Sequence, residues 1–207
     1  MRKTMFCVLM MTLLLTGCGA GEEKSLSAEE LALQLRAKYL AASGCEGTAL
    51  VTADYGERVY GFALEFTCLR DGNTELTVTA PEELEGLRAV IEQGKSRLEF
   101  QGVSLGTGDL TGEGLTPLEY LPAVMKNIES GYMAQCSFET CEDRETLRIL
   151  FRDPEKGERE GLECVLWFDR MNFALLHAEL SYRGDLVIRS DFVEFNRMET
   201  LPEQGTP

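Results

Sequence analysis

The sequence predicts an α+β fold in which one antiparallel sheet of about nine to eleven strands meanders along the chain and packs against two helices. Three observations support this expectation. Short runs in which apolar and polar residues alternate recur between residues 45 and 195, with the period of half-buried strands. Turn-forming dipeptides such as Asp-Gly separate these runs. Two other segments carry apolar residues at helical spacing behind capping residues.

The first predicted element is a helix over residues 27–42. Ser27 and Glu30 have the spacing of a capping box, and Gly44 provides a stop signal. An apolar stripe at helical spacing is formed by Leu31, Leu35 and Tyr39. We therefore expect this helix to cover an apolar surface.

The strands are predicted in two groups on either side of a second helix. The first group comprises residues 45–53, 58–69, 74–80, 87–92 and 97–105, and the second comprises 132–140, 146–152, 162–169, 174–182 and 186–195. Gly56-Glu57 and Gln93-Gly94 form the turns of two hairpins in the first group. The glycine-rich loop 106–114 has no lysine and lacks the spacing of a phosphate-binding loop, so we expect no nucleotide there.

The second helix is predicted to begin at Thr116 and end near Gly131. Thr116 is the expected cap, Pro117 occupies the first helical position and Glu119 the third. An apolar stripe follows, formed by Leu118, Leu121, Val124, Met125 and Ile128. Pro122 falls within the first turns and is expected to bend or shorten the helix.

The chain begins with the features of a lipoprotein signal peptide, predicted over residues 1–17. Arg2 and Lys3 precede an apolar run over residues 5–15, and Thr16-Gly17 lead directly to Cys18. The alternative, a transmembrane anchor, is disfavoured because this run is shorter than the roughly 20 residues needed to cross a bilayer. Cys18 is thus the predicted lipid-attachment site, and two acyl chains on it anchor a protein stably.

This leader predicts a location and a division of the chain. We expect the protein at the extracytoplasmic face of the cell membrane, held there by its lipid anchor. Residues 18–26 are the predicted lipidated cysteine and tether, 27–200 the folded domain, and 201–207 a disordered tail. The length permits one domain with a single core.

Composition and motifs argue against nucleic-acid binding and catalysis. The formal charge of −15 disfavours a nucleic-acid partner. His177 is the one histidine and has no serine or cysteine at the spacing of a catalytic triad, so no enzyme activity or catalytic residue is predicted. Neighbouring carboxylates are expected by chance among 35 acidic residues. The sequence predicts no cofactor and no metal site.

Five cysteines remain once Cys7 leaves with the signal and Cys18 carries lipid: Cys45, Cys68, Cys136, Cys141 and Cys164. A two-residue turn at Gly56-Glu57 places Cys45 opposite Cys68, which makes a disulfide between them possible. Strict counting assigns this pair to a hydrogen-bonded site, and a bulge or a longer turn breaks the register. Metal binding by these sulfurs is the weaker interpretation, and the pairing of the other three cysteines stays open.

The last third of the chain resembles the closing hairpins of the LolA/LolB-like superfamily. The residues that carry the resemblance are Val165-Leu166-Trp167-Phe168-Asp169, Leu175-Leu176, Ala178-Glu179, Gly184 and Phe192 to Phe195. The first helix, the hairpin about Asp54-Tyr55-Gly56 and the helix near Thr116 also resemble the clostridial spore-germination branch typified by the lipoprotein GerS. The resemblance covers nearly all of the chain after Cys18.

This resemblance implies a LolA-like domain, with an open, strongly curved half-barrel sheet whose concave apolar face is covered by helices. Relatives use this shape to hold acyl chains or to dock protein partners, and the germination branch implies a cell-wall amidase as partner. A homodimer is a further possibility. Candidate residues for the lining of an apolar cavity are Tyr60, Phe62, Phe66, Met125 and Trp167, which otherwise fill a packed core.

We therefore expect a membrane-anchored lipoprotein that acts by binding, as an interaction or scaffold protein in envelope or germination biology. The alternative is a carrier or receptor for acyl chains or lipoproteins. A soluble carrier of this family shuttles between membranes, whereas Cys18 fixes this chain to one membrane. An apolar cavity of several hundred Å³ beneath the Thr116 helix favours the carrier, and a fully packed core favours a protein partner.

Overall fold

A computed structural model of the chain describes residues 26–109, 114–141 and 144–199. The predicted signal peptide, Cys18 and the predicted tail lie outside the described residues. In the described part of the chain, no helix combines the length and the apolar character that crossing a membrane requires.

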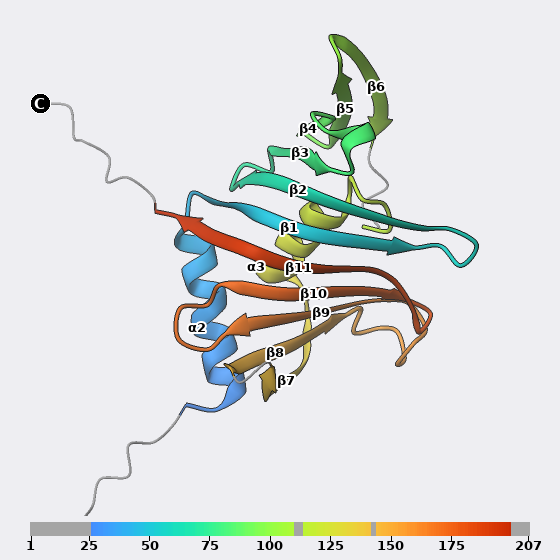
Figure 1. The fold of residues 1–207 in the computed structure, drawn as a ribbon. Helices are drawn as coiled ribbons and strands as arrows, with labels where there is room; N and C mark the ends of the chain where they lie inside the picture. Colours follow the sequence, from blue (N-terminus) through green and yellow to red (C-terminus); the bar gives the residue numbers. More distant parts are fainter. Residues whose placement is uncertain (1–25, 110–113, 142–143, 200–207) are drawn as a thin grey trace, which may run out of the picture.

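The strands form one open antiparallel sheet, as the sequence predicts (Figure 1). The eleven strands are β1 (Gly44–Asp54), β2 (Val59–Leu69), β3 (Thr74–Ala80), β4 (Arg88–Glu92), β5 (Lys95–Phe100), β6 (Val103–Asp109), β7 (Met133–Cys141), β8 (Arg144–Arg152), β9 (Leu162–Asp169), β10 (Leu175–Tyr182) and β11 (Asp185–Met198). Their order in the sheet is β6-β5-β4-β3-β2-β1-β11-β10-β9-β8-β7. The sheet therefore consists of two meanders joined by the β1–β11 pair, with β6 and β7 at its edges.

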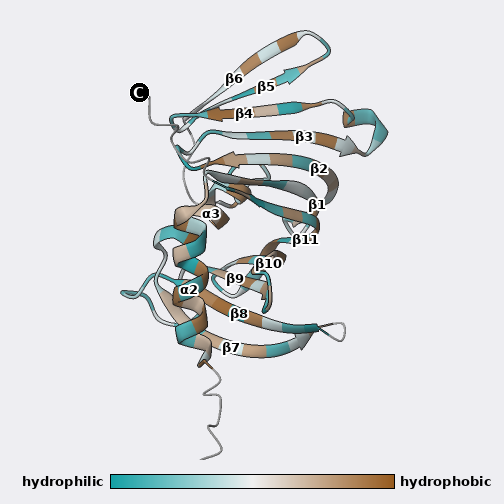
Figure 2. Cartoon of the chain, turned by 90° about the vertical axis from the view of Figure 1, so that its left-hand side faces the viewer, coloured by the Kyte–Doolittle hydropathy of each residue, from teal (hydrophilic) through white to brown (hydrophobic). Residues whose placement is uncertain are grey.

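Two α-helices of the described chain, α2 (Ala28–Ala41) and α3 (Tyr120–Ser130), lie on the same side of the curved sheet (Figure 2). The predicted capping box of α2 is present, because the Ser27 hydroxyl accepts from the backbone N–H of Glu30 and the Glu30 carboxylate accepts from that of Ser27. Arg36 of α2 donates to the carbonyls of Ile128 at 2.8 Å and Gly131 at 2.5 Å. These bonds satisfy carbonyls at the end of α3 and fix the two helices to each other. A short 3₁₀ helix, η2 (Glu82–Leu84), follows β3.

The core lies between the helices and strands β1 and β8–β11. Large side chains without measurable solvent exposure come from both helices and from three of these strands: Leu35, Tyr120, Leu121, Ile128, Leu147, Ile149, Leu166, Phe168, Leu175 and Leu180. Alternation along β9 selects Leu166 and Phe168 for this face. The half of the sheet that α2 covers is therefore closely packed.

The second helix begins three residues later than the sequence predicts, at Tyr120 and not at Pro117. Thr116 still accepts from the backbone N–H of Glu119, at 3.3 Å, but residues 117–119 form a turn and α3 starts at Tyr120. Pro122 explains the difference, because in a helix that began at Pro117 its missing N–H would leave the carbonyl of Leu118 unpaired. Starting at Tyr120 places Pro122 in the first turn, where no such bond is needed.

The predicted strand 97–105 is wrong, because this segment belongs to two strands. β5 and β6 are joined at Gln101-Gly102, which have φ of 50° and 81°. Two successive residues with positive φ are the mark of a two-residue hairpin turn of the primed type. The apolar residues occupy even positions before this turn, at Leu98 and Phe100, and odd positions after it, at Val103 and Leu105, a change of phase that the prediction of a single strand overlooked. The extra hairpin extends the sheet to Asp109, into the predicted glycine-rich loop.

Candidate binding site on the concave face

An apolar hollow of about 240 Å³ lies between strands β2–β5 and the segment that precedes α3. Its walls are formed by Phe62, Leu64, Leu76, Val78, Leu87, Ala89, Leu98, Thr116, Pro117 and Leu118. Thr116 is the one polar residue of this set. We refer to these ten residues as the apolar hollow.

Strand register brings the sheet side chains of the hollow together. Leu64 pairs with Val78, Leu76 with Ala89, and Ala89 with Leu98. Paired residues of an antiparallel sheet point to the same face, so these side chains form one apolar row across four strands. The row lies beside the closely packed core and is continuous with it.

The segment over the hollow is held on both sides. The hydroxyl of Tyr55, in the β1–β2 turn, donates to the carbonyl of Leu115 at 3.0 Å. At the start of α3, the buried Tyr120 hydroxyl is hydrogen-bonded to that of Ser190 on β11. Residues 116–118 thus lie between two fixed points, and Pro117 and Leu118 form a firm wall.

The apolar surface continues from the hollow to edge strand β6. Leu105 pairs with Leu98, and Val103 pairs with Phe100, so their side chains share the face of the hollow. Val103 is 69% exposed and Leu105 is 63% exposed. An exposed apolar strip on an edge strand, next to an apolar hollow, has the composition of a binding surface.

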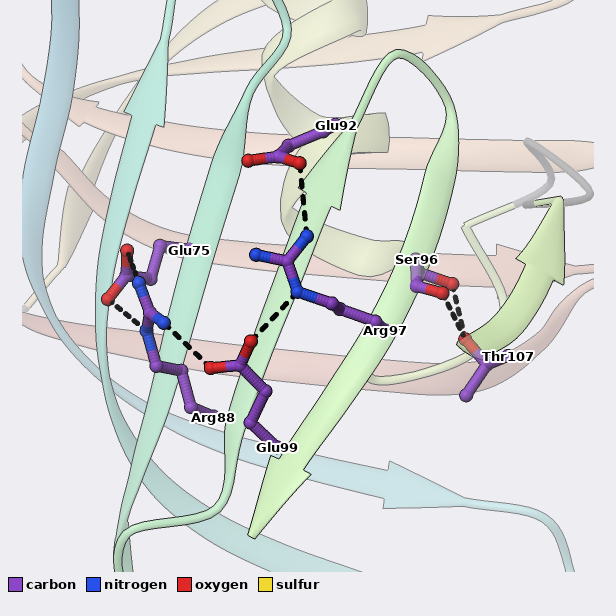
Figure 3. A network of polar contacts seen from close by, with 7 residues as sticks. All are labelled: Glu75, Arg88, Glu92, Ser96, Arg97, Glu99 and Thr107. Atoms are coloured by element: carbon purple, nitrogen blue, oxygen red, sulfur yellow. Dashed lines mark hydrogen bonds and ion pairs between the residues drawn. The ribbon is translucent and has the colours of Figure 1, made fainter. Parts of the chain in front are cut away.

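The opposite face of the same strands carries a chain of ion pairs (Figure 3). Arg88 of β4 binds Glu75 of β3 through two hydrogen bonds of 2.5 Å and Glu99 of β5 at 2.8 Å. Arg97 binds the same Glu99 at 2.8 Å and Glu92 at 3.0 Å. Hydrogen bonds from the arginines lower the pKa of Glu75 and of Glu99. The network ties β3, β4 and β5 together behind the hollow and fixes their spacing.

The predicted lining residues occupy several places. Phe62 lines the hollow, and Tyr60 stacks on it with ring centroids 6.4 Å apart. Phe66 is buried against Phe192 and Phe195 in the core. Met125 lies next to Cys45, away from the hollow. In the sequence, the row of aromatic residues on β2 indicated that this strand contributes to a cavity. The aliphatic residues of β3–β5 also line the hollow, but nothing in the sequence distinguishes them from core residues.

Trp167 lies on the opposite face of the sheet from the core, which corrects its prediction as a lining residue. Its neighbours Leu166 and Phe168 point inward, so alternation along β9 directs Trp167 outward. The indole N–H donates to Glu139 at 3.0 Å, and the Arg148 guanidinium lies 5.5 Å from its ring. The ring also contacts His177, with centroids 5.0 Å apart.

His177 belongs to this outward-facing cluster and has two carboxylate neighbours. Its Nδ1 lies 2.6 Å from Asp191 and its Nε2 lies 3.4 Å from Glu179. These hydrogen bonds raise the pKa of His177, the bond with Glu179 having the largest effect, whereas burial of the ring lowers it. Both ring nitrogens face carboxylates, an arrangement that holds a cationic imidazole and provides no nucleophile.

We expect His177 to make stability depend on pH. Because its folded pKa is raised, the stabilisation is complete below the unfolded pKa of about 6.5 and is lost as pH rises through the folded pKa. Arg148 and Arg189 lie near Glu179 and, together with His177, lower the pKa of its carboxyl group. The free energy of unfolding in urea, measured between about pH 6 and pH 8, should fall less steeply in His177→Gln than in the unaltered protein. Parallel pH profiles for the two proteins would contradict this role.

Among the described residues, no three side chains of the His, Cys, Asp and Glu types gather in a way that could hold a metal ion. The candidate site of the described chain is therefore the apolar hollow with its strip on β6. This site can recognise a ligand by shape and by apolar contact. Among the residues that line the hollow, Thr116 is the one with a polar side chain.

Comparison with protein-family models finds no match, and comparison with curated protein sequences finds none either. Solved structures of low sequence identity are similar in arrangement. An uncharacterised conserved protein from Thermus thermophilus is 10% identical with a TM-score of 0.49, the match covering 86% of this chain and 96% of that one. A LolA superfamily protein from Nitrosomonas europaea is 11% identical with a TM-score of 0.42, over 87% and 97% of the two chains.

The GerS lipoprotein complex with the CwlD amidase from Clostridioides difficile contains a third similar chain, 11% identical with a TM-score of 0.36, over 88% and 99%. Such remote similarities carry no inference about what this protein binds. The assignment of the fold rests on the strand order of this chain. An open antiparallel sheet with two helices on its concave side is the LolA-like arrangement that the sequence resemblance implied.

Proposed function

We propose that the protein is a lipid-anchored extracytoplasmic binding protein whose apolar hollow and β6 strip receive an apolar segment of a protein partner. The observation that carries the proposal is the continuous apolar surface that runs from the hollow to the exposed Val103 and Leu105. Protein interfaces place aromatic or aliphatic anchor residues of one partner into apolar pockets of the other. A free edge strand beside the pocket adds backbone donors and acceptors for an extended segment.

The size of the hollow favours a protein side chain over a whole lipid. At about 240 Å³ it lies below the range of about 300–1,000 Å³ that is typical of small-molecule sites. The adjacent core is filled by side chains without measurable exposure, which leaves no channel along which a long acyl chain would extend. A single large apolar side chain matches this space better.

The position of the hollow relative to the proposed anchor agrees with a partner outside the membrane. The tether leads into α2, which contacts β7 and β8 at one end of the sheet order. The hollow lies on β2–β5, toward the other edge (Figure 1). Residues 18–26 span at most about 30 Å when extended, so the hollow is presented away from the lipid surface.

The carrier of acyl chains is the second candidate, and the almost wholly apolar lining favours it. Organic extraction of the purified protein, followed by mass spectrometry, distinguishes the carrier from the partner-binding protein. A non-covalent adduct of lipid mass, recovered from the unaltered chain and lost in Ala89→Phe, would support the carrier, because phenylalanine at Ala89 fills the hollow. Recovery of the same adduct from both proteins would place the lipid elsewhere.

Crosslinking in intact cells tests the proposed partner site. A photoreactive side chain at Val103 is expected to give a protein adduct, whereas one at Met171, 88% exposed in the β9–β10 turn, is expected to give none. In the Val103 background, Leu105→Glu should reduce the adduct about tenfold or more, because a charge enters an apolar contact. Leu33→Glu on α2 is the matched control, since Leu33 is 61% exposed and Leu105 is 63% exposed.

Equal adduct yields in Leu105→Glu and Leu33→Glu would overturn the assignment of this surface. Adduct yields at Met171 as high as those at Val103 would also overturn it, because they would show that crosslinking is nonspecific and not confined to this surface. A mass-identified adduct with a cell-wall hydrolase would support the partner class that the sequence resemblance suggests.

A further inference from the structure

We propose that Cys45, Cys68 and Met125 form a three-sulfur binding site for a soft monovalent cation, copper(I). The two cysteines face each other across β1 and β2, and the methionine reaches them from α3. Thiolates and thioethers are soft ligands that favour copper(I), whereas zinc, which also binds thiolates, takes four ligands in its structural sites. The site is independent of the apolar hollow and of the function proposed for it.

The three sulfur atoms already lie together. The distance from Cys45 Sγ to Met125 Sδ is 3.4 Å, and Cys68 lies directly opposite Cys45 in the strand pair, close enough for its thiol to raise the pKa of Cys45. With metal–sulfur bonds of about 2.3 Å, a trigonal site places its sulfurs about 4.0 Å apart. Met125 is half-buried on a flexible thioether chain, so a shift of about half an ångström brings its sulfur to this separation from that of Cys45.

The hairpin register favours two separate thiols over a disulfide. The backbone N–H of Tyr55 donates to Arg58 at the turn, and β1 and β2 continue from there without a bulge. Counting in steps of two from this pair makes Cys45 and Cys68 a hydrogen-bonded pair, whose Cβ atoms are about 5.5 Å apart. A disulfide requires a Cβ separation of about 3.5–4.5 Å. In the structure both cysteines are free thiols.

A small space beside the sulfurs provides room and a way in. A hollow of about 30 Å³ is lined by Tyr39, Ala42, Gly44, Cys45, Cys68, Leu69, Arg70, Met125 and Glu129. This volume is roughly that of one water molecule in the liquid, which suffices for a bare monovalent ion. Both cysteines are more than nine-tenths buried, so the ion would be shielded from water once bound.

Binding of copper(I) at these three sulfurs requires no change of oxidation state. The two S–H bonds break, their protons leave to solvent, two thiolate–copper bonds form, and the thioether donates a lone pair. The bound unit carries one negative charge; of the two charged residues at the rim of the small hollow, Arg70 favours that charge and Glu129 opposes it. A cation also removes the penalty that burial and the neighbouring thiol impose on a bare Cys45 thiolate.

The test is a competition for copper(I) between the reduced full-length protein in mild detergent and the chromophoric chelator bicinchoninate, under anaerobic conditions. Cys45→Ala is expected to lose one equivalent of bound copper, and Met125→Leu is expected to weaken that equivalent about tenfold. Cys164→Ala and Met133→Leu are the matched controls, because both remove a sulfur from the core cluster away from the site. X-ray absorption of the copper-loaded protein should show sulfur ligands.

Equal copper binding by Cys45→Ala and Cys164→Ala would overturn the site. An unchanged affinity in Met125→Leu would remove methionine from it and overturn the three-sulfur arrangement. If the protein isolated from cells has a mass 2 Da lower than its reduced form and a peptide map joins Cys45 to Cys68, the pair is a disulfide and the proposal fails. Circular dichroism of each variant establishes that the loss of copper does not reflect unfolding.

Discussion

Replacing Cys18 with alanine is expected to release the protein from the membrane. If Cys18 carries two acyl chains, each buried methylene contributes about 0.8 kcal/mol of membrane affinity, which the variant loses. The acidic sequence is itself repelled by anionic lipid. The membrane-bound fraction should therefore drop at least about 100-fold.

Detergent phase partitioning and metabolic labelling with an alkyne fatty acid measure this effect together. The unaltered protein should enter the detergent phase and carry the label, whereas Cys18→Ala should remain in the aqueous phase without it. Cys141→Ala is the control, because Cys141 is an exposed cysteine of the folded part. Label retained by Cys18→Ala, or lost equally from Cys141→Ala, would show that the anchor lies elsewhere.

Truncating Phe168 to alanine is expected to reduce the free energy of unfolding by about 3–5 kcal/mol. Phe168 has no measurable exposure, belongs to the shared core and meets Tyr39 of α2 edge to face, with ring centroids 5.9 Å apart. Removing the ring loses its burial and leaves a cavity that the neighbouring residues fill incompletely. It also loosens the contact by which α2 is held on the sheet.

Urea denaturation followed by circular dichroism measures this loss. Phe138→Ala is the matched control, because Phe138 is the same residue type on edge strand β7 and is 39% exposed. It packs beneath Arg170, whose guanidinium lies 4.4 Å from its ring centroid, so a cost below about 1.5 kcal/mol is expected. Similar losses in the two variants would mean that the core is not concentrated where the structure places it.

Local patterns predicted the elements of this fold well where the sequence itself contains the physical cause. Ser27 and Glu30 predicted the start of α2 because both partners of the capping box lie within four residues. The turn at Gly56-Glu57 predicted the facing positions of Cys45 and Cys68, because strand pairing propagates from a turn in fixed steps. The Gln101-Gly102 turn was missed although the apolar positions change there from even to odd, because Gln101 is not a residue typical of such turns.

The candidate site depended on contacts that no local pattern contains. The apolar hollow needs Leu76, Ala89 and Leu98 from three strands together with Leu118, and each of these residues alone is indistinguishable from core. Trp167 was assigned to a cavity by its residue type, although strand alternation with Leu166 and Phe168 places it outside. Met125 meets Cys45 from 80 positions away, so the cluster of three sulfurs is a product of tertiary packing.

The join between β1 and β11 has a consequence for how the molecule is assembled. In the described sheet, every other strand pair connects neighbours in the chain, whereas this pair closes a loop that spans almost the whole domain. Ladders of near neighbours form early, and contacts of long sequence separation form late. Until β11 pairs with it, β1 presents an unpaired edge that is open to other chains. The last strand thus joins the two meanders into one sheet and covers the edge of β1. A chain truncated before Asp185 is therefore expected to aggregate and not to fold as a smaller domain.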